Sequence, residues 1–337
     1  MRKLLLAVVF VSALTETYAH DNLKSAKKFS SFVVQPRTNN SFTLSIAQVQ
    51  ALNKIGELSQ GLQQSSYYKN VSPDTFISQL TDRIINPYML NQGKTLFCWA
   101  AAPVAYFYDQ SPVNMVEAVF NLYASGTFRF FNGNEYLSLT PGNRSVCAVG
   151  SETFSKNSDP LSGKVVDQMV LLTFADSYKC WINIDHRFNP GDQRKAIWAG
   201  ATLNKEKRVW RDFGINVKKH GSDMLWAKKN KADILKDAID QNKAVVLYIN
   251  AAYFNKKADK IRMMRRRPPF ITTGSHYILV KGFEKKQDEY RITFWDDDGL
   301  QNYSISPDLF QRSVFGIVAF TKEGLAMNTT NETGMVD

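Results

Sequence analysis

Cysteine and histidine are scarce in this sequence of 337 residues, which has three of the first and four of the second. Long apolar runs are missing beyond the N-terminus, so no later segment approaches the length that crosses a bilayer. We find no internal repeat, no low-complexity block, no nucleic-acid-binding motif and no calcium-loop spacing. These absences leave repeat arrays and multi-span membrane proteins without support, and no metal or cofactor is expected.

The first 19 residues have the pattern of an export signal. A basic start at Arg2 and Lys3 precedes an apolar stretch from Leu4 to Leu14 and a small-residue cleavage site ending at Ala19. The apolar stretch is short for a bilayer, although a single N-terminal anchor is the alternative. We therefore expect a secreted protein, periplasmic or extracellular, with no stable membrane insertion after residues 1–19 are removed.

The charge balance is basic. Removal of Arg2, Lys3 and Glu16 with the signal changes the net charge from +11 to +10. A basic surface attracts anionic partners without choosing among them. Since no basic and aromatic side chains alternate along a groove-like segment, nucleic acid is not an expected partner.

An odd number of cysteines leaves one thiol over in an exported protein. The economical pairing joins Cys147 to Cys180 and leaves Cys98 free. Three unpaired thiols are the alternative, because neither spacing nor context proves a bridge.

Helical patterns dominate the first half. Helices are predicted over residues 45–66 and, after a cap at Ser72, up to Ile84. Helix-forming and apolar residues then run from Cys98 to Ser111. Cys98 is therefore expected at the N-terminus of a largely buried helix, with Pro103 in about its first turn.

The second half has the signals of an antiparallel sheet. A helix over residues 233–241 precedes an apolar strand over 244–249 that must be buried on both faces. Two further strand patterns, 276–283 and 290–295, are separated by a turn and form a hairpin. A helical half followed by such a sheet predicts the α+β class.

The free thiol is the first candidate for chemistry. A thiol attacks carbonyl groups as the thiolate, which the positive end of a helix and a nearby imidazolium both favour. Of the four histidines, His276 alone opens an apolar strand, whereas His20, His186 and His220 lie at the processing site or in polar surroundings. A structural role is the alternative for His276.

Acidic residues end the strand that follows. In an antiparallel pair the start of one strand lies beside the end of the next, so Asp296 can reach and orient His276. Alternation puts Asp298 on the same side as Asp296. The alternatives for these carboxylates are a solvated turn or a weak calcium site. Gln92, in a glycine-containing loop, can join the Cys98 amide in binding an oxyanion.

These residues resemble the papain-like cysteine peptidases. In that family a glutamine precedes the nucleophile by six residues and Trp-Ala follows it, as Gln92 and Cys98-Trp99-Ala100 do here. The order Gln, Cys, His and then Asn or Asp is also similar. Two features differ: Leu96-Phe97 replaces the usual Gly-Ser, and the Asn-Ser-Trp-Gly motif is missing.

A closer overall resemblance is to the bacterial Mac-type immunoglobulin G-degrading endopeptidases, which are secreted enzymes of papain fold. The similar segments are Gly93 to Ala101, Tyr106 to Gln110, Ile234 to Val246, the strand at His276, and Asp296-x-Asp298. The resemblance implies a papain-like catalytic domain over residues 76–325. Polarity and periodicity predict an arm and helix over residues 20–75 and a loose tail over 326–337.

The same resemblance implies a catalytic triad of Cys98, His276 and Asp296, assisted by Asp298. It also implies a role in virulence and a protein substrate such as immunoglobulin G. That family places an oxyanion lysine ten residues before the nucleophile, near Tyr88 and Met89 of this chain, so the oxyanion role is assigned to Gln92. A cell-wall peptide amidase of the same fold, or an inactive immunoglobulin-binding protein or adhesin, is the alternative.

A basic cluster at Arg262 and Arg265 to Arg267 lies in the loop before His276. It fits selection of an acidic substrate or docking of a large protein. A solvated loop or a processing site is an equal alternative.

Overall fold

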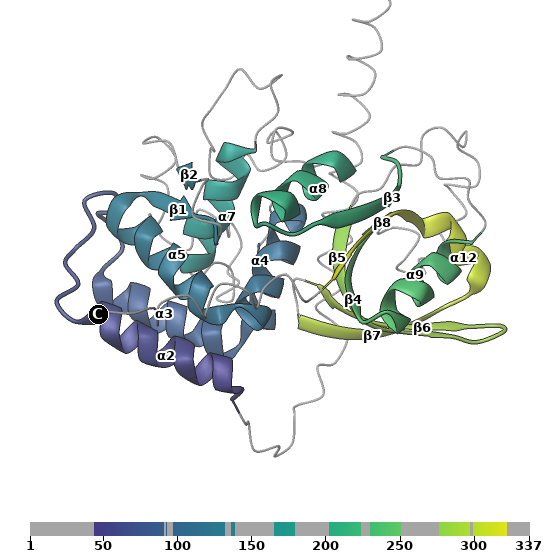
Figure 1. Ribbon diagram of the computed structural model, residues 1–337, viewed down its shortest axis with the longest axis horizontal. Helices are drawn as coiled ribbons and strands as arrows, with labels where there is room; N and C mark the ends of the chain where they lie inside the picture. Colours follow the sequence, from purple (N-terminus) through teal and green to yellow (C-terminus); the bar gives the residue numbers. More distant parts are fainter. Residues whose placement is uncertain are drawn as a thin grey trace, which may run out of the picture.

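The computed structural model describes residues 44–90, 92, 97–131, 136–138, 165–178, 202–223, 230–250, 276–296 and 299–321. In these residues a group of helices lies beside a six-stranded antiparallel sheet, which confirms the predicted α+β class (Figure 1). The helices are α2 (Ile46–Ser59), α3 (Pro73–Ile85), the 3-10 turn η1 (Pro87–Met89), α4 (Cys98–Gln110), α5 (Pro112–Ser125), α7 (Val165–Ser177), α8 (Leu203–Asp212), α9 (Lys231–Asp240) and α12 (Pro307–Ser313).

The strands of the large sheet are β3 (Val217–Gly221), β4 (Lys243–Ile249), β5 (His276–Lys285), β6 (Tyr290–Asp296), β7 (Gly299–Ile305) and β8 (Val314–Thr321). Their order is β3-β8-β4-β5-β6-β7, and every neighbouring pair is antiparallel. A separate ribbon pairs β1 (Thr127–Arg129) with β2 (Tyr136–Ser138).

Side-chain capping explains where the first helices begin. The Ser45 hydroxyl accepts from the Gln48 amide while the Gln48 side chain accepts from the Ser45 amide, a reciprocal cap for α2. Helix α2 ends at Ser59 rather than near residue 66, just before Gly61 in the left-handed conformation (φ 73°). Apolar residues recur at helical spacing from Ile46 to Leu58, yet Ile46 at the start of α2 is 80% exposed.

Helix α3 begins as predicted. The Ser72 hydroxyl accepts from the backbone amide of Thr75, and Phe76, Leu80 and Ile84 are buried in the first core. Helices α2, α3, α5 and α7 form one end of the molecule, and α4 and α8 lie between them and the sheet (Figure 1).

Helix α4 starts at Cys98, as predicted, and is buried from Trp99 to Tyr108. Pro103 lies in its second turn rather than its first. Because proline has no N–H, the carbonyl of Trp99 loses its helical hydrogen bond. The hydrogen-bond ladder is therefore interrupted near the N-terminus of a helix that is buried along most of its length.

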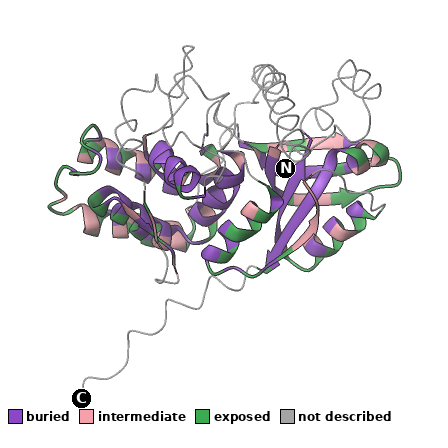
Figure 2. Ribbon diagram, turned by 90° about the horizontal axis from the view of Figure 1, so that it is seen from above, coloured by how far each residue is buried: buried purple, intermediate pink, exposed green. Residues whose placement is uncertain are grey.

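The large sheet separates two hydrophobic cores. Ala244, Val246 and Tyr248 of β4 belong to the core shared with α4 and the other helices, and the alternate residues Val245 and Leu247 belong to the core under α9 and α12. Burial on both faces of β4 was predicted from its apolar run. Buried residues accordingly follow the strands and the central helices (Figure 2).

The predicted hairpin is present, since β5 and β6 pair on either side of a turn in which the Lys286 amide donates to the Glu289 carbonyl. Strands β3, β7 and β8 were not predicted. Strand β8 carries an apolar run from Val314 to Phe320 that fits the same rule as β4, and it occupies the inner position between β3 and β4.

Candidate active site

Cys98 is the first residue of α4. Its thiol is not in a disulfide, and its side chain is partly buried against the first core. Phe97 precedes the helix and provides no side-chain cap, so the first amides of the helix point out from its N-terminus. The partial positive charge of that end favours a negative charge on the sulfur.

His276 and Asp296 lie where the hairpin argument places them, at the start of β5 and the end of β6. Nε2 of His276 is 2.6 Å from Oδ1 of Asp296, and the two side chains are 17% and 18% exposed. A carboxylate can only accept a hydrogen bond, so Nε2 carries the proton and donates it. This contact fixes the ring and leaves Nδ1 for another partner.

That partner is Cys98, the candidate nucleophile. The side chain of His276 is also hydrogen-bonded to the side chain of Cys98. Burial by itself lowers the pKa of His276, but the Asp296 carboxylate and the Cys98 sulfur outweigh it and raise the pKa well above the ordinary value. The imidazolium is therefore stabilised between two groups that carry or can carry negative charge.

Two tyrosines beside the thiol were missed from the sequence. Tyr248 of β4 and Tyr277 of β5 are register partners with rings stacked 4.5 Å apart, and both are nearly buried. Burial raises the pKa of each phenol, and the charges of Asp223 and Cys98 raise it further. Both hydroxyls therefore stay protonated and neutral. Tyr277 follows His276 directly, but only the strand pairing brings Tyr248 to it.

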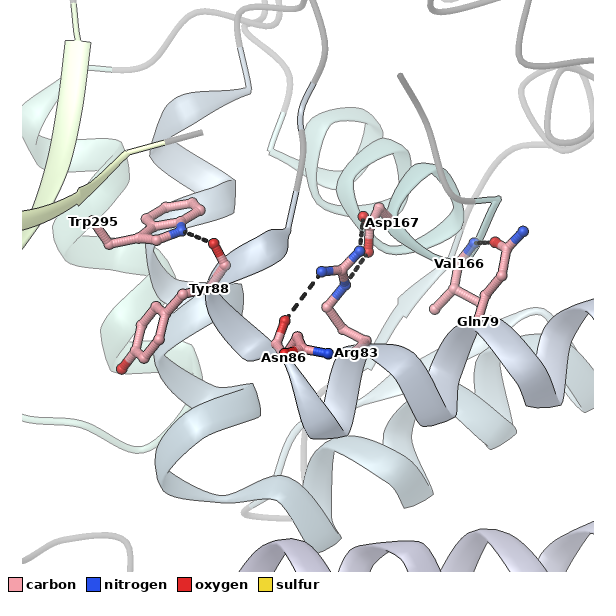
Figure 3. A network of polar contacts seen from close by, with 7 residues as sticks. All are labelled: Gln79, Arg83, Asn86, Tyr88, Val166, Asp167 and Trp295. Carbon is pink, nitrogen blue, oxygen red and sulfur yellow. Dashed lines mark hydrogen bonds and ion pairs between the residues drawn. The ribbon is translucent and has the colours of Figure 1, made fainter. Parts of the chain in front are cut away.

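The turn that precedes the Gln92 segment is fastened to the acid-bearing strand. The indole N–H of Trp295, the residue before Asp296, donates to the carbonyl of Tyr88 at 2.7 Å (Figure 3). Behind this turn, Arg83 pairs with the carboxylate of Asp167 at 2.9 and 2.7 Å.

Of the remaining residues considered in the sequence, Gln92 and His220 lie within the described ranges and the others do not. Gln92 is buried, at 5% exposed, and its oxyanion role stays a prediction. His220 is on β3, opposite Ile317 of β8, and is not one of the groups that influence His276. The others lie outside the described residues: Asp298, Cys147, Cys180, His20, His186, the basic cluster at 262–267, residues 1–19 and the tail from 326.

Neither a metal nor a membrane site emerges from the described ranges. They contain no group of three histidine, cysteine, aspartate or glutamate side chains that could hold a metal ion. Among the same residues, no helix has the length and apolar character needed to cross a bilayer.

No protein-family model matches the sequence, and no curated protein matches it either. The geometry around Cys98, His276 and Asp296 therefore carries the functional argument by itself.

Proposed function

We propose that the protein is a secreted cysteine endopeptidase of papain-like architecture that cleaves a protein substrate, with immunoglobulin G as the specific candidate. The observation that carries the proposal is the position of one imidazole, which is hydrogen-bonded to the Cys98 side chain on one side and to the Asp296 carboxylate on the other. A helix N-terminus, a strand start and a strand end supply the three side chains. Structural histidines have no need of a thiol as second partner.

The reaction follows from these contacts. The Cys98 thiolate attacks the scissile carbonyl carbon, and the carbonyl electron pair moves to the oxygen. The Cys98 backbone N–H and the Gln92 side chain bind that oxyanion. As the oxyanion collapses, the C–N bond breaks and His276 gives its proton to the leaving amine, which leaves a thioester on Cys98.

Water completes the cycle. His276, now neutral, takes a proton from a water molecule, whose oxygen attacks the thioester carbonyl. The C–S bond breaks, a carboxylic acid leaves, and the Cys98 thiolate and the imidazolium are restored. Asp296 keeps the ring in one orientation through both steps and stabilises its positive charge.

The experiment is a direct cleavage assay with the chain that begins near His20. Wild type, Cys98→Ala and Cys98→Ser are each incubated with purified immunoglobulin G, with an unrelated protein and with peptidoglycan fragments. The masses of the products are then measured by mass spectrometry. We expect fragments of a protein substrate from wild type alone.

The other outcomes separate the alternatives. Release of peptide from peptidoglycan fragments alone identifies an amidase of the same architecture. If wild type and Cys98→Ala bind immunoglobulin equally and neither cuts anything, the protein is a binder and the enzyme proposal is wrong.

A further inference from the structure

The helix that carries the nucleophile and the strand that carries the base run side by side. Cys98 and His276 are the first residues of α4 and β5, and these two elements pack against each other. Asp109 lies eleven residues along α4, which is roughly 16 Å at the helical rise. Lys281 lies five residues along β5, which is also roughly 16 Å at the strand rise. Because the two spans are equal, Asp109 and Lys281 are expected to lie next to each other, as Cys98 and His276 do.

A second contact does join the two elements there. Nζ of Lys281 is 3.3 Å from Oδ2 of Asp109, and the two side chains are 26% and 27% exposed. The hydroxyl of Tyr88 donates to the same carboxylate oxygen and accepts from Lys281, whose Nζ lies 4.3 Å from the Tyr88 ring centroid. Burial and the Asp109 charge both raise the pKa of Tyr88, so its hydroxyl remains a donor over the working pH range.

Lys281 occupies a β-bulge. Val280 pairs with Phe294 and Gly282 with Thr293, so Lys281 is the additional residue in β5. The bulge interrupts the ladder and redirects side chains, which is why Phe283 rather than residue 282 packs against the second core. An ordinary ion pair of this exposure contributes only about 0–1 kcal/mol. Stability alone therefore gives little reason for a bulge that directs a lysine at α4.

Tyr88 is held firmly from the other side. Its carbonyl accepts from the Trp295 indole, and Nη1 of Arg83 donates at 3.2 Å to the carbonyl of Asn86, where η1 begins (Figure 3). Arg83 is itself fixed by its buried pair with Asp167. The turn is thus anchored to α3 and β6, and through Arg83 to α7, by contacts that involve neither Lys281 nor Asp109.

We propose that Lys281 and Asp109, bridged by Tyr88, are positioning residues that set the orientation of α4 against β5. The inference rests on the proposed function, because it concerns how the Cys98 sulfur is kept at His276. A shift of about 1 Å at one end of a 16 Å lever changes the helix direction by roughly 3–4°. Misplacement of reacting groups by about 1 Å can cost a hundredfold in rate, so small changes of this angle matter.

The test uses thiol reactivity, which needs no substrate. Lys281→Met keeps the apolar stem over the Tyr88 ring and removes the charge, and Asp109→Asn removes the opposite charge. Lys285→Met is the matched control, because Lys285 also lies on β5 and is ion-paired, but with Asp233 of α9. The rate of Cys98 alkylation by iodoacetamide is followed from pH 5 to 9.5 in each protein.

An ordinary cysteine, with a pKa of about 8.5, reacts slowly below pH 7. We expect Lys281→Met and Asp109→Asn to react about 5–10 times more slowly than wild type near pH 5.5 and equally fast at pH 9.5. Lys285→Met should follow wild type throughout. The titratable groups that interact with His276 or Cys98, namely Asp296, Tyr248 and Tyr277, are unchanged in all three variants.

Two results overturn the inference in distinguishable ways. If wild type is reactive at pH 5.5 and Lys281→Met and Asp109→Asn have the same profile as wild type, the positioning role is wrong and the proposed function stands. If Cys98 of wild type itself reacts only as an ordinary thiol, there is no Cys98–His276 ion pair to position, and both proposals fail.

Discussion

Replacement of Asp296 by asparagine isolates the charge of the residue that holds His276. The side-chain shape is kept, and the amide oxygen can still accept from Nε2 across the present 2.6 Å. A hydrogen bond to a charged group contributes about 1.5–3 kcal/mol and a neutral one about 0.5–1.5, so the difference between the midpoints is about 1.25 kcal/mol. Since one pKa unit corresponds to about 1.4 kcal/mol, we expect the pKa of His276 to fall by about one unit.

The sign of the effect on activity follows from the direction of the pKa shift. The pKa of His276 in the folded protein lies well above its ordinary value, so the imidazolium is present below that pKa and is lost as the pH rises through it. The same holds for the stability that the ion pair contributes, which is complete below about pH 6.5. In Asp296→Asn the loss begins about one unit lower, so kcat/KM on the alkaline limb of the pH profile falls about tenfold, and it falls much less below that limb.

Two measurements check this prediction. Imidazole NMR titration gives the pKa of His276 directly, because the chain has only four histidines to resolve. The pH profile of kcat/KM should show the alkaline limb displaced downward by about one pH unit. Asp288→Asn is the control, because it removes the same charge from the exposed turn of the same hairpin. A His276 pKa that is the same in Asp296→Asn and wild type would refute the reasoning.

Three further predictions concern stability. Lys231 is 3% exposed and donates to two carbonyls, and burial lowers its pKa to about 8, below the unfolded value near 10.5. The unfolded state therefore binds more protons above pH 8, and the folded state becomes more stable as the pH rises. In urea titrations, the unfolding free energy of wild type relative to Lys231→Met should rise by about 3 kcal/mol between pH 7.5 and 10.5. Arg83→Met alone should cost about 3–5 kcal/mol, whereas the double change with Asp167→Leu should restore most of it, as urea midpoints will show. Gly221→Ala should lower the melting temperature by several degrees, because the new Cβ would lie 2.2 Å from the carbonyl oxygen of Phe315 at φ +109°; an unchanged melting temperature contradicts this account.

Much of the local structure could be predicted from the sequence. The start of α4 at Cys98, the cap at Ser72 and the hairpin of β5 and β6 all follow from capping residues, periodicity and turn chemistry. The proximity of His276 and Asp296 also follows, because an antiparallel pair joined by a short turn brings the start of β5 beside the end of β6. These predictions succeed because each depends on residues close together in the chain.

Predictions that depended on packing were less accurate. Ile46 fits the helical spacing of apolar residues in α2 but is exposed, since periodicity alone does not show which turns another element will cover. Pro103 was placed a turn too early, and the buried surroundings of α4 tolerate it. Strand β8 was overlooked although its apolar run is as clear as that of β4.

The sequence by itself determined which side chains are candidates for chemistry and which elements carry them. Only the tertiary structure decided that α4 lies along β5, that Tyr248 reaches Tyr277, and that Lys281 meets Asp109. The physical reason is distance along the chain. Contacts between separate segments, such as β4 with β5 or α4 with β5, are selected by how whole faces pack and by a bulge in one strand, and no local pattern encodes that choice.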